Sequence, residues 1–181
     1  MSSDPTGGHG AGDLGAMFDA HCEAEFVGRD IDATMATMNA APHITNMPTM
    51  TGGFGFGAVR HFYDNYFVGH VPDDWTVMPI SRTVGESQLV DEVMISFTHD
   101  SDMPAILPGV KPTGSKVTIP FVVVVGFEDG KVAFERNYWD QASILAQIGL
   151  LDKTNLPVSG AEQAARLRDP SLPSNTLITK V

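Results

Sequence analysis

Asp140 combines a reactive side chain with a setting that suits proton transfer. It follows Tyr138 and Trp139 at the end of an expected strand and precedes an apolar helical segment. Aromatic neighbours remove water from a carboxylate and favour its protonated form, as a general acid or base working near neutral pH requires. An Asp before a helix is also a good N-cap, and the two interpretations are compatible. Asp140 is therefore the first candidate catalytic residue.

His99 is the second candidate, because it ends a strand with alternating polarity. In the segment 89–100, one face carries Val93, Ile95, Phe97 and His99. If this face lines a cavity, the His99 ring lies beside whatever the cavity holds. A single histidine on an apolar face is more commonly a core residue with satisfied hydrogen bonds, and that alternative stays open.

Glu135 is the third candidate. On the strand expected over 132–139 it shares a face with Asn137 and Trp139. A carboxylate beside these side chains in a pocket would be functional. The alternative is a solvated side chain that pairs with Arg136 or a neighbouring lysine, and the alternation of this strand does not decide between them.

The sequence carries no other catalytic or metal-binding motif that we recognise. No pair of His or Cys residues has the spacing of a metal site, and no Gly-x-Ser-x-Gly segment occurs. The glycine-rich turn at 51–57 lacks the Lys-Ser/Thr ending of a phosphate-binding loop. Among the other histidines, His21 on the first expected helix could reach a pocket. We expect neither a metal ion nor a cofactor.

The composition is that of an acidic globular protein. The 181 residues include 22 Asp and Glu against 11 Lys and Arg, for a formal net charge of −11, and 43% are hydrophobic. Such a chain is too apolar for disorder, and its charge argues against nucleic acid and anionic lipid as partners. No apolar run approaches the roughly 20 residues of a membrane span, and the first residues lack a signal-peptide pattern. Cys22 is the only cysteine, so no disulfide framework exists, and we expect a cytoplasmic protein.

Helices precede strands along the chain. Helical spacing of apolar residues predicts one helix over 13–27 and a short second one that Asp30 or Asp32 can cap. A third helix has a core-facing stripe made of Val59, Phe62, Tyr63, Tyr66 and Phe67.

Strands follow after Pro72, and one helix comes after them. Strands are expected over 75–84, 89–100, 116–127 and 132–139, with a bulge at Pro79 and an Asp129-Gly130 hairpin turn. This order predicts an α+β fold in which helices gather on one face of a curved antiparallel sheet. Such a sheet can curl into a cone whose mouth holds a small ligand. The long connection 101–114 could act as a lid, with Met103, Ile106 and Leu107 on its apolar underside. The alternatives are an ordinary stiff connector and a surface covered by a second subunit.

Three segments carry a resemblance to a known family. They are Thr98-His99 followed by Pro108-Gly109 and Pro112-Thr113-Gly114, then Gly130-Lys131-Val132 with Glu135, and then the run from Tyr138-Trp139-Asp140 to Gln147-Ile148-Gly149. The sequence resembles the SnoaL-like polyketide cyclases of the nuclear-transport-factor-2-like superfamily, which also contains scytalone dehydratase and ketosteroid isomerase. The resemblance spans residues 13–152, which leaves a flexible tail at 1–12 and a C-terminal extension at 153–181.

This resemblance implies a cone-shaped α+β barrel, a cystatin-like roll with helices on the concave face of the sheet, and a homodimer formed through the sheet. It implies that Asp140 is the acid/base, that His99 polarises a carbonyl oxygen, and that Glu135 and Trp139 point into the cavity. Asn46 falls near the position of the isomerase base. The expected substrate contacts are Trp139, Asn46, Phe97, His21, Tyr63, Met103 and Leu107.

The expected function is acid/base catalysis without a cofactor on a polyketide-like carbonyl compound, by aldol cyclisation, isomerisation or dehydration. One alternative is a non-catalytic module of the same fold that binds a small ligand or dimerises. Another is a hydro-lyase of the scytalone dehydratase type, which would need a second catalytic histidine, and His43 and His21 are the options for it.

Overall fold

The computed structural model describes residues 11–178 of the chain, so the predicted tail at 1–12 lies mostly outside the described residues. The helical elements are α1 (Ala11–Cys22), η1 (Glu23–Gly28), α2 (Ile31–Ala36), α3 (Phe56–Phe62), η2 (Tyr63–Phe67), α4 (Gln141–Gln147) and α5 (Glu162–Arg168). The strands are β1 (Met38–Asn46), β2 (Thr51–Phe54), β3 (Thr76–Val84), β4 (Gln88–Thr98), β5 (Lys116–Glu128) and β6 (Lys131–Trp139). The predicted α+β class is confirmed.

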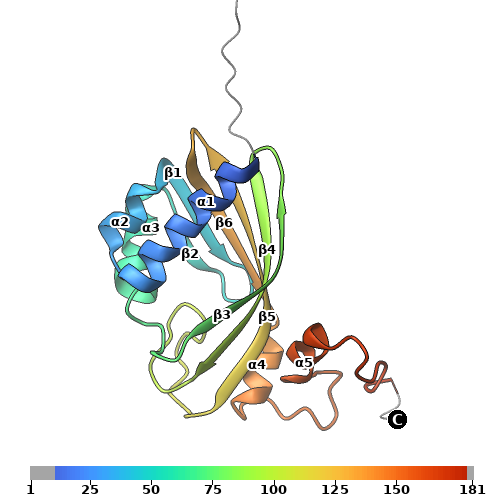
Figure 1. Cartoon of the computed structure of the whole chain (residues 1–181). Coiled ribbons are helices and arrows are strands. Elements are labelled where there is room, and N and C mark those ends of the chain that lie inside the picture. Colours follow the sequence, from blue (N-terminus) through green and yellow to red (C-terminus); the bar gives the residue numbers. More distant parts are fainter. Residues whose placement is uncertain (1–10, 179–181) are drawn as a thin grey trace, which may run out of the picture.

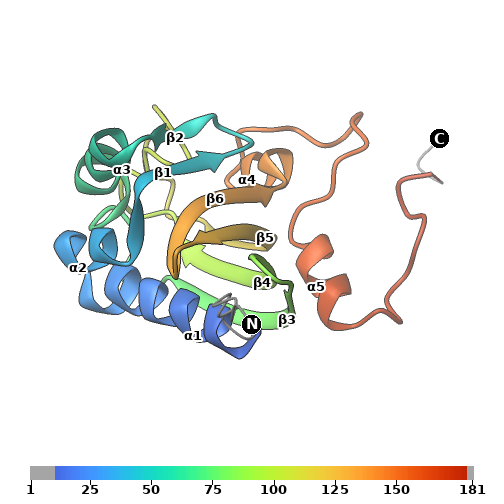
Figure 2. The same cartoon turned by 90° about the horizontal axis from the view of Figure 1, so that it is seen from above.

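The six strands form one sheet in the order β2-β1-β6-β5-β4-β3 (Figure 2). The last four strands are joined in antiparallel pairs, and β1 and β2 form a separate hairpin. The β1 strand runs parallel to β6, so the predicted antiparallel sheet is in fact mixed. Side chains alternate between the two faces of a strand whether its neighbour is parallel or antiparallel. The alternation in the sequence therefore cannot indicate this parallel pairing.

The helices α1, α2 and α3 lie together beside one part of the curved sheet, while α4 and α5 lie at its other end, next to β5 (Figure 1). The helix predicted over 13–27 changes at Glu23 from α to the wider π form. The third helix does the same at Tyr63. Its predicted core stripe is correct for Val59, Phe62 and Tyr63, and Phe67 packs against the core. Tyr66 is exposed, because the wider turn shifts it off the predicted face.

Local sequence signals determine several turns and irregularities of the fold. Asp129 and Gly130 both adopt positive φ, which closes the β5–β6 hairpin as predicted. The β3–β4 register shifts after Pro79, where proline cannot donate to the ladder. The glycine-rich stretch at 51–57, predicted as a turn, contains β2. At Gly53 a Cβ atom would collide with the backbone of Ala58, so glycine lets α3 pack directly onto this strand.

Candidate active site

A cavity of about 110 Å³ lies between the first helices and the inner face of the sheet. Its wall is mostly apolar and aromatic. The polar lining residues, apart from Cys22, are Glu25, Asn46, Tyr63, Asp91, Glu135 and Asn137. An apolar cavity of about 150 Å³ can hold benzene, so this one suits a compound with a single ring.

His21 lies at the end of α1, behind this wall, and is fully buried. Its Nδ1 is 2.6 Å from Thr37 Oγ1, and the Thr37 hydroxyl donates to the carbonyl oxygen of Thr34 at 2.6 Å. A carbonyl oxygen can only accept, so the Thr37 proton is committed and Thr37 must accept from His21. The His21 ring therefore carries a proton on Nδ1, and its Nε2 faces the cavity residues.

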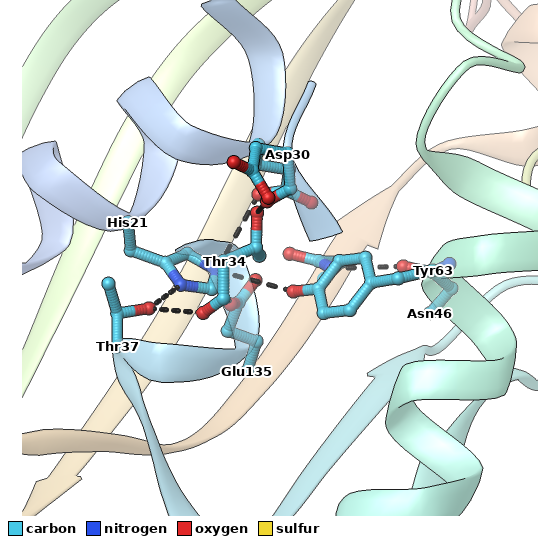
Figure 3. A network of polar contacts seen from close by, with 9 residues as sticks. His21, Asp30, Thr34, Thr37, Asn46, Tyr63 and Glu135 are labelled. Carbon is cyan, nitrogen blue, oxygen red and sulfur yellow. Dashed lines mark hydrogen bonds and ion pairs between the residues drawn. The ribbon is translucent and has the colours of Figure 1, made fainter. Parts of the chain in front are cut away.

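Three side chains from different elements meet at Nε2 of His21, and Figure 3 shows two of them, Glu135 and Tyr63. The nearest atom is Oε1 of Glu135 at 2.8 Å, followed by Oη of Tyr63 at 3.2 Å and Oε2 of Glu25 at 3.6 Å. The contact with Glu135 is an ion pair at hydrogen-bonding distance. Both carboxylates are more than nine-tenths buried, at 5% exposed for Glu25 and 6% for Glu135. We call these four residues the His21 cluster.

The electrostatics of the cluster keep His21 charged at neutral pH. Burial by itself lowers the pKa of His21, but the charge of Glu135, a hydrogen bond to Glu135 and the charge of Glu25 together raise it to about 9. An imidazolium ion therefore lies between the two carboxyl groups, with Nδ1–H held by Thr37 and Nε2–H turned toward Glu135 and Tyr63.

The two carboxyl groups cannot both ionise easily in so small a space. Burial and the negative charge of Glu135 raise the pKa of Glu25 to about 8, against the opposing effect of His21. Glu25 is then mainly a carboxylic acid at neutral pH, able to donate a hydrogen bond into the cavity. Burial and the two carboxylates also raise the pKa of the Tyr63 hydroxyl, which stays neutral.

Asp91 is the remaining acidic residue at the cavity wall. Both of its oxygens are bound by Arg82, at 2.6 Å from Nε and 2.7 Å from Nη2. Arg82 also reaches Asp19 on α1 at 2.8 Å. This bidentate pairing satisfies Asp91, so it holds the helix against the sheet and contributes little free charge to the cavity.

Some of the predicted site residues meet at this cavity. Glu135, Tyr63 and Asn46 line it, and His21 contacts two of its lining residues, Glu135 and Tyr63, directly. Phe97 lies one layer deeper and stacks on Trp75, which lines the cavity. Trp139 stacks on the lining residue Phe121 and donates to Gln141 from its indole nitrogen.

The predicted acid/base, Asp140, is not brought to the cavity. One carboxylate oxygen accepts from Ser143 N–H at 3.2 Å and caps α4, and the other accepts from Gln163 in the C-terminal extension. The expected N-cap role is confirmed, but Asp140 lies apart from Glu135 and its catalytic role stays a prediction.

His99 and the long loop also lie away from the cavity lining. The His99 ring is fully buried, Nδ1 contacts the Thr113 hydroxyl at 3.2 Å, and burial lowers the pKa of the ring. In the loop 101–114, the side chains of Met103 and Leu107 are buried but do not line the cavity, whereas Ile106 lines it. This loop therefore supplies part of the wall, and its action as a lid stays a prediction.

Sequence reasoning missed Glu25 and Asn137 as site residues. Glu25 follows His21 by four residues on the same helical face and lies on the core-facing stripe with Phe18. A carboxylate at a core position was the signal available for it. Asn137 shares the inner face of β6 with Glu135, and only the position of the cavity shows that this face is functional.

Within residues 11–178, no group of three or more His, Cys, Asp and Glu side chains is arranged to hold a metal ion. No helix in this range is both long and apolar enough to cross a membrane.

The fold and the cavity together define an α+β protein of the nuclear-transport-factor-2-like type. The sequence profile of the SnoaL-like polyketide cyclases matches residues 22–148. The chain belongs to the SnoaL-like polyketide cyclase family, which confirms the resemblance drawn from the sequence.

Solved structures share the fold at low sequence identity. A candidate SnoaL-like polyketide cyclase from Jannaschia sp. CCS1 superposes with a TM-score of 0.62 at 19% identity, over 83% of this chain and 100% of that one. A candidate polyketide cyclase from Xanthomonas campestris pv. campestris gives 0.58 at 19% identity, over 76% and 98%. A protein of unknown function from Burkholderia pseudomallei K96243 gives 0.57 at 18%, over 75% and 97%. No curated protein matches the sequence significantly.

Proposed function

We propose that this protein is a cofactor-independent enzyme that moves a proton at a carbon atom next to a carbonyl group in a small, polyketide-like ring compound. The observation that carries the proposal is the pairing in one apolar cavity of a carboxylate, Glu135, with a carboxyl group that holds its proton, Glu25. Two carboxyl groups whose surroundings push their protonation apart are the usual basis for dividing acid and base roles.

Glu135 is the base in this proposal. Its carboxylate lines the cavity, and the His21 ion pair engages Oε1, which leaves the other oxygen, Oε2, for a substrate proton. The His21 imidazolium at 2.8 Å balances the charge of this buried carboxylate. The hydrogen bond from His21 to Thr37 fixes the orientation of the ring, so the ion pair is held in place before the substrate arrives.

Glu25 stabilises the negative oxygen that forms when the proton leaves. As a carboxylic acid facing the same cavity, it donates a hydrogen bond to the enolate oxygen and can pass its proton to that oxygen. A well-placed donor of this kind contributes about 3–4 kcal/mol to the transition state. The aromatic wall, which includes Phe26, Phe62 and Trp75, keeps water from this site and strengthens both interactions.

The same groups support each reaction expected from the sequence. Return of the proton to another carbon gives isomerisation, attack of the enolate on a second carbonyl gives aldol closure, and loss of a β-hydroxyl gives dehydration. In the last case Glu25 would protonate the departing oxygen. These outcomes share the first step, so the first step is the one to test.

That step is measured by exchange of carbon-bound hydrogen for deuterium. Purified protein is incubated in D₂O with a panel of cyclic ketones and β-keto esters, and deuterium uptake is followed by mass spectrometry. We expect uptake faster than in buffer alone, and a loss of about 10²–10⁴-fold in the variant Glu135→Gln, the range for removal of a general base. Glu128→Gln is the matched control, because Glu128 lies on the same hairpin but is exposed.

Exchange that is equal in Glu135→Gln and in the unchanged protein would refute the proposed base. The absence of exchange with every compound, while ring compounds still bind, would favour the non-catalytic binding module over the enzyme.

A further inference from the structure

Asn137 is a polar residue of the cavity that the proposed proton transfer does not use. It follows Glu135 by two residues on β6, so both side chains lie on the inner face of the sheet. Its Nδ2 group donates to Oδ1 of Asn46 at 3.0 Å. The hydrogen-bond network decides which way the oxygen and the nitrogen of an amide point. Here the network ends at a group whose role as donor or acceptor is known.

That fixed end is the backbone carbonyl oxygen of Ala105, which can only accept. The Thr51 hydroxyl donates to it at 2.8 Å and so has no proton left for another partner. Asn46 lies 2.9 Å from Thr51 Oγ1 and must therefore present its amino group there. The side-chain carbonyl oxygen of Asn46 therefore points toward Asn137, and Asn137 must donate to it from its own amino group.

The chain of bonds leaves the Asn137 carbonyl oxygen on the opposite side of the amide. In the described part of the chain, no residue donates to this oxygen. Asn137 is half-buried, so an apolar ligand that covers this oxygen leaves it unpaired at a cost in free energy, whereas a ligand that supplies a donor avoids that cost. The Ala105–Thr51–Asn46 chain therefore holds Asn137 as a preset acceptor.

We infer that Asn137 selects substrates that carry a hydroxyl group as well as the carbonyl. The inference rests on the proposed function, because it takes the same cavity as the substrate site. Residues two apart on a strand are about 7 Å apart, which is close to the span of a six-membered ring with its substituents. The substrate class is thus a hydroxylated single-ring carbonyl compound, with its reacting carbon at Glu135 and its hydroxyl at Asn137. Asn137 positions and selects, while Glu135 reacts.

Binding of phenol and toluene tests this selection without any turnover. The two probes have similar size, and only phenol can donate a hydrogen bond. The dissociation constant of each probe is measured by calorimetry or NMR titration. The dissociation constant of toluene divided by that of phenol is then compared between variants, because the different hydration of the two probes cancels in this comparison. In Asn137→Leu, which keeps the side-chain volume and removes the acceptor, we expect this ratio to fall by about 5- to 100-fold.

The chain that orients Asn137 has its own variant and control. Thr51→Val removes the link to Ala105 and lets both amides turn, so the ratio should fall there too. Thr49→Val is the control, because Thr49 donates to the Ala105 carbonyl at 3.0 Å and contacts the Thr51 hydroxyl at 3.0 Å, but it has no bond to Asn46 and its loss leaves the Thr51–Ala105 bond in place. That variant should keep the ratio of the unchanged protein. Circular dichroism and the unfolding midpoint show whether each variant is folded.

An unchanged ratio in Asn137→Leu would overturn the inference, and a fall there without one in Thr51→Val would overturn the orienting role of the chain. Failure of both probes to bind would overturn both this inference and the use of the cavity as a substrate site. Selective binding of phenol together with normal deuterium exchange in Glu135→Gln would instead refute only the proposed function.

Discussion

Replacing Glu25 by Gln should make the stability of the protein less sensitive to pH, because the folded protein holds a proton on Glu25 that the unfolded chain releases. The pKa of Glu25 is raised from 4.5 to about 8, and that of His21 from 6.5 to about 9. A group with a raised pKa in the folded state stabilises fully below its unfolded pKa, and this contribution is lost as the pH rises through the folded pKa. Both groups therefore weaken the fold as the pH increases.

The size of the effect follows from these values. Each proton held only by the folded state changes the free energy of unfolding by about 1.4 kcal/mol per pH unit. Between pH 6.5 and 8, partial titration at each end leaves a loss of about 1.6 kcal/mol from Glu25 and a similar loss from His21. Glu25 and His21 together should cost the unchanged protein about 3 kcal/mol over this interval, and in Glu25→Gln only about half of this loss remains.

Urea unfolding followed by circular dichroism at pH 6.5 and pH 8 measures this difference. His43 and His99 have lowered pKa values and act in the opposite direction, but they are present in both proteins and cancel in the comparison. Glu23→Gln is the control, since Glu23 lies on the same helical turn and is exposed. Equal pH dependence in Glu25→Gln and the unchanged protein would show that Glu25 is ionised, and would refute the division of roles in the cavity.

Three further outcomes are expected. Asp140→Asn keeps a good N-cap and should change the free energy of unfolding by less than about 0.5 kcal/mol; a loss of deuterium exchange of about 10²-fold in this variant would assign the base to Asp140 instead of Glu135. Gly126→Ala should cost about 1–3 kcal/mol in urea unfolding, because the added Cβ would collide with the Phe134 ring, and unchanged stability would contradict this packing. We also predict a homodimer formed through the sheet, which sedimentation equilibrium would show as twice the chain mass, and a monomer at all concentrations would contradict it.

Much of the fold could be predicted from the sequence, because its signals are local. The Asp129-Gly130 turn, the bulge after Pro79 and the N-cap at Asp140 each depend on a few adjacent residues, and each is present. The parallel pairing of β1 with β6 depends on residues about 90 positions apart, and no local pattern encodes it.

The site was harder to predict, because proton chemistry depends on neighbours in space. Glu135, Tyr63 and Asn46 are expected site residues that line the cavity, and their roles stay predictions. Glu25 was missed because its protonation arises from burial beside Glu135, which belongs to a strand more than 100 residues later. The order of atoms in the Asn137 amide depends on a carbonyl group at Ala105, so it too could come only from the structure.

The proposed chemistry requires Glu135 to be ionised and Glu25 to be protonated in one cavity at neutral pH. The most direct test is a pH titration of the protein labelled with ¹³C at the glutamate side-chain carboxyl groups, followed by NMR, with Glu25→Gln to assign the signal. We expect one carboxyl resonance that titrates near pH 8 and is missing from the variant. If every glutamate titrates in the ordinary acidic range, the cavity holds no carboxylic acid at neutral pH and the proposed chemistry is wrong.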